Sequence, residues 1–81
     1  MENKGIVMYG TTWCPDCARA KRIFAARGVE YQWTNIDEEP DKAELVMRLN
    51  NGKRIVPTII FPDGSRLSEP SNAELEAKLK A

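Results

Sequence analysis

The stretch that decides the fold is IVMYGTTWCPDC, at positions 6–17. Its first four residues form a short apolar run between Gly5 and Gly10, which is typical of a central strand buried on both faces of a sheet. The pattern becomes helical from Pro15, a residue that suits the first turn of a helix because its missing N–H is not needed there. The stretch therefore predicts a strand, a loop and a helix, with two cysteines where the loop meets the helix.

The remaining sequence continues this alternation of strands and helices. Gly28 is typical of the left-handed residue that follows a helix, and Ser71 with Glu74 has the spacing of a capping box, which starts a helix. The predicted elements are a strand at 6–9, a helix at 15–27, a strand at 29–36, a helix that begins within 37–41 and runs to about 49, strands at 56–61 and 65–67, and a helix that begins at 71. The order β-α-β-α-β-β-α predicts an α/β fold, with a mixed four-stranded sheet and helices on both faces.

Length and composition restrict the function. With 81 residues the chain has room for one small core, so we expect a single domain over residues 1–81. Twelve basic and twelve acidic residues balance, which argues against nucleic-acid binding. No apolar run reaches the ~18–20 residues of a membrane span, and the segment after residues 1–4 is too short for a signal peptide. The expectation is a cytoplasmic protein without a membrane partner.

The chain has no histidine and two cysteines, Cys14 and Cys17. Without histidine, neither a Cys-His nucleophile pair nor a histidine-based metal site can form, and no bound metal is expected. The free N–H groups at the helix start would stabilise a thiolate on Cys14. Cys17 lies on the predicted buried stripe of the helix with Ala20 and Phe24. This spacing predicts a redox pair in which Cys14 attacks a disulfide and Cys17 resolves the product, although two inert core cysteines, or half of a zinc site shared by a dimer, remain alternatives.

The motif Trp-Cys-Pro-Asp-Cys after a strand, the Ile-Val-Pro step at 55–57 and the order of elements resemble the thioredoxin fold. The length resembles its glutaredoxin branch, and the Thr-Thr-Trp-Cys start and the x-Pro-Ser segment at 69–71 are most similar to mycoredoxins. The resemblance implies a cis peptide before Pro57 and a Val56 backbone that pairs with the substrate. It also implies that Trp13 and Pro15 flank the site.

The resemblance implies a thiol-disulfide oxidoreductase that reduces protein disulfides or mixed disulfides of small thiols. It would hold no bound cofactor and would take electrons from a small thiol, mycothiol or glutathione, or from a flavoprotein disulfide reductase. Many glutathione-dependent glutaredoxins have a Lys where this chain has Thr11, and a glycine-containing turn where it has residues 67–72. These departures favour a donor of the mycothiol kind. A monomer is expected; the alternative class is a dimeric module that binds an iron–sulfur cluster, which Pro15 argues against.

Further residues are candidates for substrate binding. The basic side chains that could surround the cysteines and attract anionic thiols are Arg19, Lys21, Arg22, Lys53 and Arg54. Lys53 and Arg54 are favoured because they lie nearest to the Val-Pro step, whereas ordinary solvated charge is the alternative for all five. Ser71 is predicted to cap the last helix, and the same helix start, with Asn72, is a candidate receiver of a substrate carboxylate.

Overall fold

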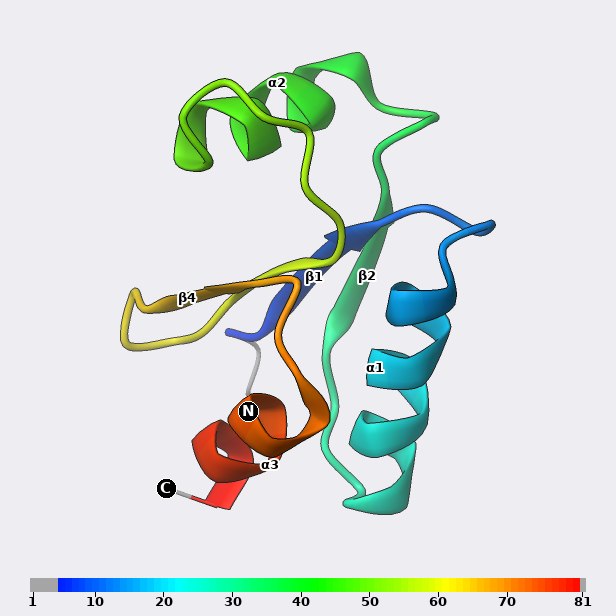
Figure 1. Ribbon diagram of the computed structural model, residues 1–81, viewed down its shortest axis with the longest axis vertical. Coiled ribbons are helices and arrows are strands. Elements are labelled where there is room, and N and C mark those ends of the chain that lie inside the picture. The colour runs from blue at the N-terminus through cyan, green and yellow to red at the C-terminus, as the bar shows by residue number, and fades with distance from the viewer. Residues whose placement is uncertain (1–4, 81) are drawn as a thin grey trace.

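A computed structural model of the chain describes residues 5–80, so the expectations that concern residues 1–4 and 81 lie outside it. The order of elements predicted from the sequence is confirmed (Figure 1). The elements are β1 (Val7–Gly10), α1 (Pro15–Ala26), β2 (Gln32–Asn35), α2 (Pro40–Leu49), β3 (Thr58–Ile60), β4 (Arg66–Ser68) and α3 (Asn72–Lys80). Within the described residues, no helix is long and apolar enough to cross a membrane.

The four strands form one mixed sheet in the order β2-β1-β3-β4. The central strand β1 runs parallel to β2 and antiparallel to β3, and β3 pairs antiparallel with β4. Because β1 and β2 are parallel, their carboxyl ends meet at one edge of the sheet, where Gly10 lies opposite Asn35. The loops that follow both strands are therefore neighbours, and one of them carries the cysteines.

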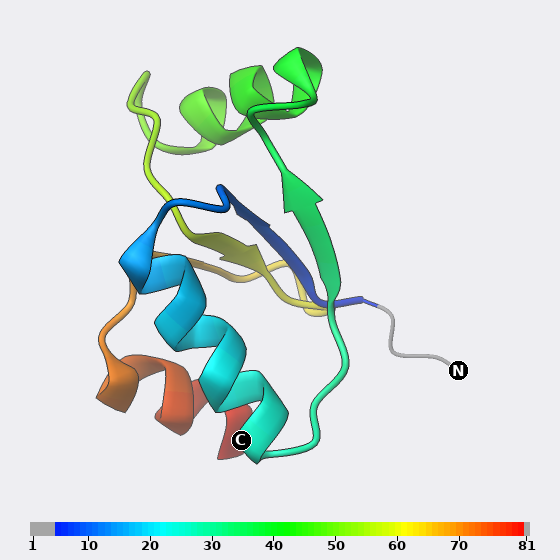
Figure 2. The same cartoon turned by 90° about the vertical axis from the view of Figure 1, so that its right-hand side faces the viewer.

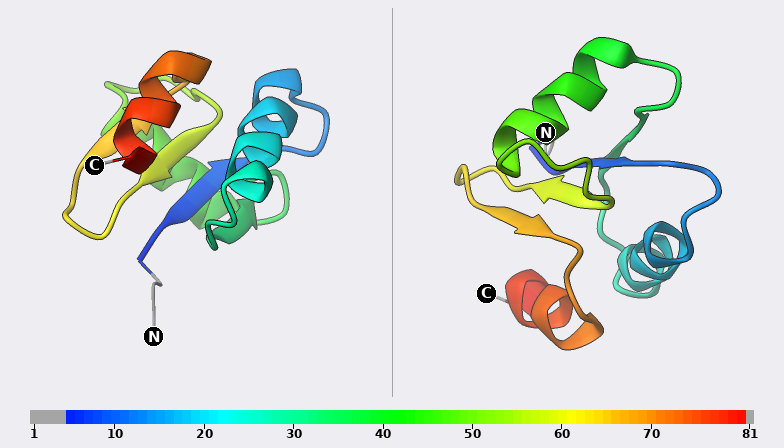
Figure 3. Two further views of the ribbon diagram at one scale, coloured as in Figure 1. Left: turned by 90° about the horizontal axis from the view of Figure 1, so that it is seen from below. Right: turned by 45° about the horizontal axis from the view of Figure 1, so that its top comes forward.

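Helices cover both faces of the sheet, as predicted. Figures 1 and 2 show α2 on one side, and α1 and α3 together on the other; Figure 3 shows α1 and α3 side by side. Successive residues of β1 point to opposite faces, so their side chains contribute to two hydrophobic cores. The core under α1 and α3 contains Met8, Ala20, Phe24, Ile59, Phe61 and Leu75. The core under α2 contains Tyr9, Ile36 and Val46.

Two strands are shorter than predicted. β2 begins at Gln32 rather than at residue 29, because the N–H of Val29 donates to the carbonyl of Phe24 at the end of α1 (3.0 Å) and is not available to the sheet. Gly28 has the left-handed conformation expected of it (φ 65°) and directs the chain back. β3 begins at Thr58, after the Val56–Pro57 peptide, which is cis.

Candidate active site

Cys14 is the N-cap residue of α1. Its backbone is extended (φ −88°, ψ 116°), Pro15 follows as the first helical residue, and the N–H of Cys17 donates to the Cys14 Sγ at 3.2 Å. The sulfur therefore occupies the position that the side-chain oxygen of Ser or Asp takes at other helix starts. A negative charge on this sulfur is stabilised by the N–H group and by the positive end of the helix dipole.

Cys17 lies deeper than Cys14. It is 1% exposed, against 7% for Cys14, and both thiols are free. Burial, and then the hydrogen bond with Cys14, raise the pKa of Cys17 to about 12, against smaller opposing effects of the Thr11 backbone and Lys21. Cys17 is therefore a protonated thiol at neutral pH. Gly10 makes room for it, because a Cβ there would lie 2.5 Å from the Cys17 sulfur.

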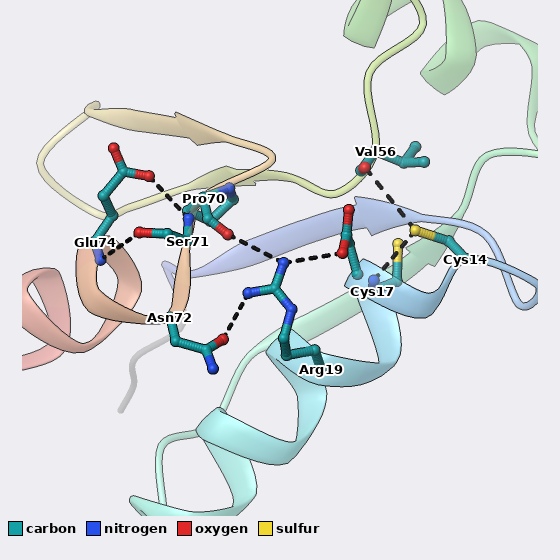
Figure 4. A network of polar contacts seen from close by, with 9 residues as sticks. Cys14, Cys17, Arg19, Val56, Pro70, Ser71, Asn72 and Glu74 are labelled. Carbon is teal, nitrogen blue, oxygen red and sulfur yellow. Dashed lines mark hydrogen bonds and ion pairs between the residues drawn. The ribbon is translucent and has the colours of Figure 1, made fainter.

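The loop before β3 lies against the reactive edge. The Cys14 Sγ is 3.9 Å from the carbonyl oxygen of Val56 (Figure 4), and Pro57 behind it is buried. The sequence-predicted residues Cys14, Val56 and Pro57, far apart in the chain, are thus brought together. The contact leaves the thiol of Cys14 between a helix N-terminus and a backbone carbonyl.

Asp37 joins the three loops around this edge, and sequence reasoning missed it. Its carboxylate accepts a hydrogen bond from the indole N–H of Trp13 at 2.8 Å and pairs with Arg54 at 2.7 Å. The hydrogen bonds from Arg54 and then Trp13 hold the pKa of Asp37 below its ordinary value. The parallel pairing of β1 and β2 was the signal that could have found it, because residues that follow such strands meet. Lys53, on the same loop as Arg54, is exposed.

Trp13 is the most exposed large apolar side chain near the cysteines. It is 66% exposed although it adjoins the buried Cys14. The hydrogen bond to Asp37 fixes one edge of its indole, and most of the side chain is open to solvent. Trp13 thus offers an exposed apolar surface on the residue that precedes Cys14, and its role in flanking the substrate stays a prediction.

The start of α3 is closed by the chain's own side chains. Ser71 Oγ accepts from the N–H of Glu74 (3.1 Å), and the Glu74 carboxylate accepts from the N–H of Ser71 (2.8 Å), so the predicted capping box forms (Figure 4). The side chain of Asn72 accepts a hydrogen bond from Arg19 of α1 at 2.6 Å. Ser71 and Asn72 thus lie on the α1 side of the sheet, at the junction of the two helices.

Taken together, a mixed four-stranded sheet and a Cys-x-x-Cys pair at the first turn of α1 define a thiol-disulfide oxidoreductase of the thioredoxin fold. The sequence model of the glutaredoxin family matches residues 6–66, and the chain belongs to that family.

Relatives and solved structures agree with this assignment. The chain is 39% identical over 79 residues to a candidate glutaredoxin of Mycobacterium tuberculosis, which covers 98% of this chain and 94% of that protein. It is 36% identical over 76 residues to Mycoredoxin 1 of Corynebacterium glutamicum, with 94% of each chain covered. The crystal structure of a glutaredoxin from Methanosarcina mazei superposes with a TM-score of 0.76, at 25% identity, over 95% of this chain and 79% of that one.

Proposed function

We propose that this oxidoreductase works as a dithiol enzyme on protein disulfides and on mixed disulfides of small thiols. The Cys14 thiolate attacks one sulfur of the substrate, a Cys14–substrate disulfide forms, and the other sulfur leaves as a thiolate that takes up a proton. Cys17 then loses its proton, attacks the Cys14 sulfur and releases the first substrate sulfur as a thiol. The protein ends with a Cys14–Cys17 disulfide, and the substrate has gained two electrons and two protons.

The observation that carries this assignment is the difference between the two sulfurs. Cys14 accepts a helix N–H, whereas Cys17 is 1% exposed with a pKa raised to about 12. A sulfur with that pKa does not start a reaction at neutral pH, but it can act once a leaving thiolate beside it takes its proton. The chain has no histidine that could take this proton.

We infer that a small thiol of the mycothiol kind, kept reduced by its flavoprotein reductase, returns the two electrons. Three features oppose glutathione, which is anionic at both ends. Thr11 offers no positive charge, Pro70 has no N–H, and the carboxylate of Glu74 already accepts from the N–H of Ser71. The likeness to Mycoredoxin 1, by its name a mycothiol-system protein, supports the same choice.

On this proposal the substrate lies along the loop before β3. The Val56 backbone pairs with it, Trp13 and Pro15 contact it on one side, and the cation Lys53 attracts its carboxylates. Arg54 is held by Asp37 at 2.7 Å, so it contributes through the shape of the loop. The protein acts as a monomer.

Exchanging the two cysteines separately tests the assignment. Cys14→Ser should lower disulfide reductase activity by more than a thousandfold, because it removes the nucleophile. Cys17→Ser should instead accumulate a mixed disulfide with a protein substrate, visible by mass spectrometry on non-reduced protein. A Cys17→Ser enzyme that is inactive and forms no adduct, beside an active Cys14→Ser enzyme, would reverse the roles.

Coupled NADPH assays test the donor. The protein is paired in turn with mycothiol, with glutathione and with a thioredoxin reductase, each with its own recycling enzyme. We expect turnover with mycothiol to exceed turnover with glutathione by at least a hundredfold, because two lost charged hydrogen bonds cost roughly 1.5–3 kcal/mol each. Efficient, saturable turnover with glutathione would refute the mycothiol assignment.

A further inference from the structure

Arg19 connects the first turns of the two helices that flank the reactive edge. One terminal nitrogen of its guanidinium donates to the Asn72 side chain at 2.6 Å. The other donates to the Asp16 carboxylate at 3.0 Å and to the carbonyl oxygen of Pro70 at 3.4 Å (Figure 4). The side chain is only 30% exposed. Its neighbours are all acceptors, and they come from the cysteine motif on one side and from the start of α3 on the other.

Among the partners of Arg19, Asp16 is the one whose charge can affect Cys14. It lies between Cys14 and Cys17 in the sequence and in the first turn of α1. An unpaired carboxylate in this turn would oppose the negative charge that Cys14 must carry when it attacks. Arginine suits the task of pairing it, because its charge persists at every accessible pH and its planar donors hold a fixed orientation.

We propose that Arg19 is a positioning residue of the oxidoreductase. It keeps the Asp16 carboxylate paired, which weakens the repulsion between that carboxylate and the charge on Cys14, and it ties the segment that enters α3 to the cysteine-bearing helix. It touches neither the reacting sulfurs nor, on this proposal, the substrate. It acts on the charge of Cys14 through Asp16, and on the start of α3 through Asn72.

Four other charged groups near the site already have partners. On α1, the Lys21 ammonium lies 3.5 Å from the Trp33 ring centroid. In the loops, Asp37 pairs with Arg54. On α3, Glu74 accepts the N–H of Ser71. Loss of Arg19 would therefore leave the charge on Asp16 without a partner among these groups.

The first test measures the pH profile of Cys14 alkylation by iodoacetamide, in a Cys17→Ser background so that one thiol reacts. Arg19→Ala should move the midpoint up by about half a pH unit, the effect expected of one solvent-screened charge some residues away. Arg19→Lys should retain most of the wild-type profile. The double variant Arg19→Ala with Asp16→Asn should return to it, because both charges are gone.

Arg48→Ala is the matched control, since it removes the same charge from an exposed site on α2. An unchanged midpoint in Arg19→Ala, a shift that persists in the double variant, or an equal shift in Arg48→Ala would each overturn the proposal. Should Arg19→Ala fold poorly by circular dichroism, Arg19→Gln carries the same prediction, because it removes the charge and keeps the length of the side chain.

The second test separates the Asn72 contact. In an Asp16→Asn background, Arg19→Ala should raise KM for a small-thiol mixed disulfide roughly threefold to tenfold, the effect of one hydrogen bond, with kcat unchanged. Asn72→Ala should give the same increase, and the two changes together should give no more. Additive increases, or a fall in kcat alone, would overturn this part of the proposal.

Only this second test rests on the proposed function, because it measures substrate binding. It also takes the start of α3, with Asn72, as the site that receives the substrate carboxylate. The alkylation profile needs no donor and no substrate. Failure of every small thiol as a donor would therefore refute the proposed donor, and the alkylation result would still decide the role of Arg19.

Discussion

The N-termini of α1 and α3 present the same backbone N–H groups, but the acceptors of those groups differ. Each presents N–H groups that lack a partner within the helix. At α1 the acceptor is the Cys14 sulfur, 3.2 Å from the N–H of Cys17. At α3 the acceptors are the side chains of Ser71 and Glu74, which close a reciprocal pair. One terminus holds a reactive group, and the other is satisfied by the chain itself.

The comparison shows that the chemistry of a helix start depends on the residue that caps it. A sulfur at the cap is at once a hydrogen-bond acceptor and a nucleophile, so the same donor that stabilises α1 also stabilises the attacking thiolate. At α3 the cap is the Ser71 hydroxyl, and the Glu74 carboxylate that completes the capping box places negative charge where an anionic substrate would bind. Arg19 connects the two termini, because it donates to Asp16 on one side and to Asn72 and Pro70 on the other.

The largest effect expected at the α1 terminus is the pH dependence that the buried Cys17 thiol gives to the free energy of unfolding. The Cys17 pKa is raised from 9.0 to about 12 on folding. Between these values the unfolded chain binds fewer protons than the folded one, so the free energy of unfolding falls as pH rises. The contribution is fully present below pH 9 and is lost at up to about 1.4 kcal/mol per pH unit above it.

Urea unfolding of the reduced protein between pH 8 and 10.5 measures this slope. Cys17→Ala is the control, because it keeps every other titrating group, including Tyr31, whose pKa burial also raises. The wild-type slope should be the steeper of the two by about 1 kcal/mol per pH unit. Equal slopes would mean that Cys17 ionises as readily in the folded state as in the unfolded one.

Gly10→Ala should disturb the start of α1 by crowding the Cys17 side chain. The added Cβ would lie 2.5 Å from the Cys17 sulfur and 2.9 Å from the Trp33 ring. Crowding of this kind costs about 1–3 kcal/mol. Denaturant unfolding should show this loss, and stopped-flow measurement should show slower release of a mixed disulfide.

The double variant Gly10→Ala with Cys17→Ala tests the cause of that loss. Removing the sulfur should restore part of the stability, since the contact with Trp33 remains. A double variant as unstable as the sum of its single changes would show that Gly10 does not serve to accommodate Cys17.

Much of the fold could be predicted because local signals agreed with one another. Pro15, Gly28 and the capping box at Ser71 each mark an element boundary by a mechanism that acts within a few residues, and all three are where the sequence placed them. The start of β2 was placed too early because two local signals competed at Val29. Val29 has strand propensity, but its N–H donates to the Phe24 carbonyl five residues back, as part of the motif that ends α1 at Gly28.

The site residues also fall into two groups, those marked by a short motif and those joined by contacts between distant parts of the chain. The cysteine pair and the Val56–Pro57 step are short motifs, so sequence was enough to nominate them. The contacts of Asp37 with Trp13 and Arg54, and that of Arg19 with Asn72, join residues 17 to 53 positions apart, and no local pattern encodes such partners. The charged side chains of α3 also pair over long distances in the chain: Glu76 pairs with Arg27 and Lys78 with Asp63, because tertiary partners compete with helical neighbours.

Two variants of Glu74 separate the cap of α3 from its charge. Glu74→Ala removes the acceptor of the Ser71 N–H and should cost about 1 kcal/mol of stability. Glu74→Gln keeps an acceptor and should cost little. Both should lower KM for an anionic thiol substrate, because the negative charge is gone. If only Glu74→Ala lowers KM, substrate binding at this terminus depends on the freed N–H of Ser71 and not on the charge of Glu74.

The smallest effect concerns the loop that leads into α1, where Asp37 accepts the indole N–H of Trp13 at 2.8 Å. Hydrogen bonds from Arg54 and then Trp13 lower the pKa of Asp37 below 3.8. Protonation of its carboxylate should weaken the contact and change the emission of Trp13. In a Trp33→Phe background, a fluorescence titration should therefore have its midpoint below pH 3.8, and Asp37→Asn should abolish it. Arg54→Ala should move the midpoint upward, toward the ordinary value, because the first hydrogen bond is lost. A midpoint that does not respond to the loss of Arg54 would mean that the three loops are not coupled through Asp37.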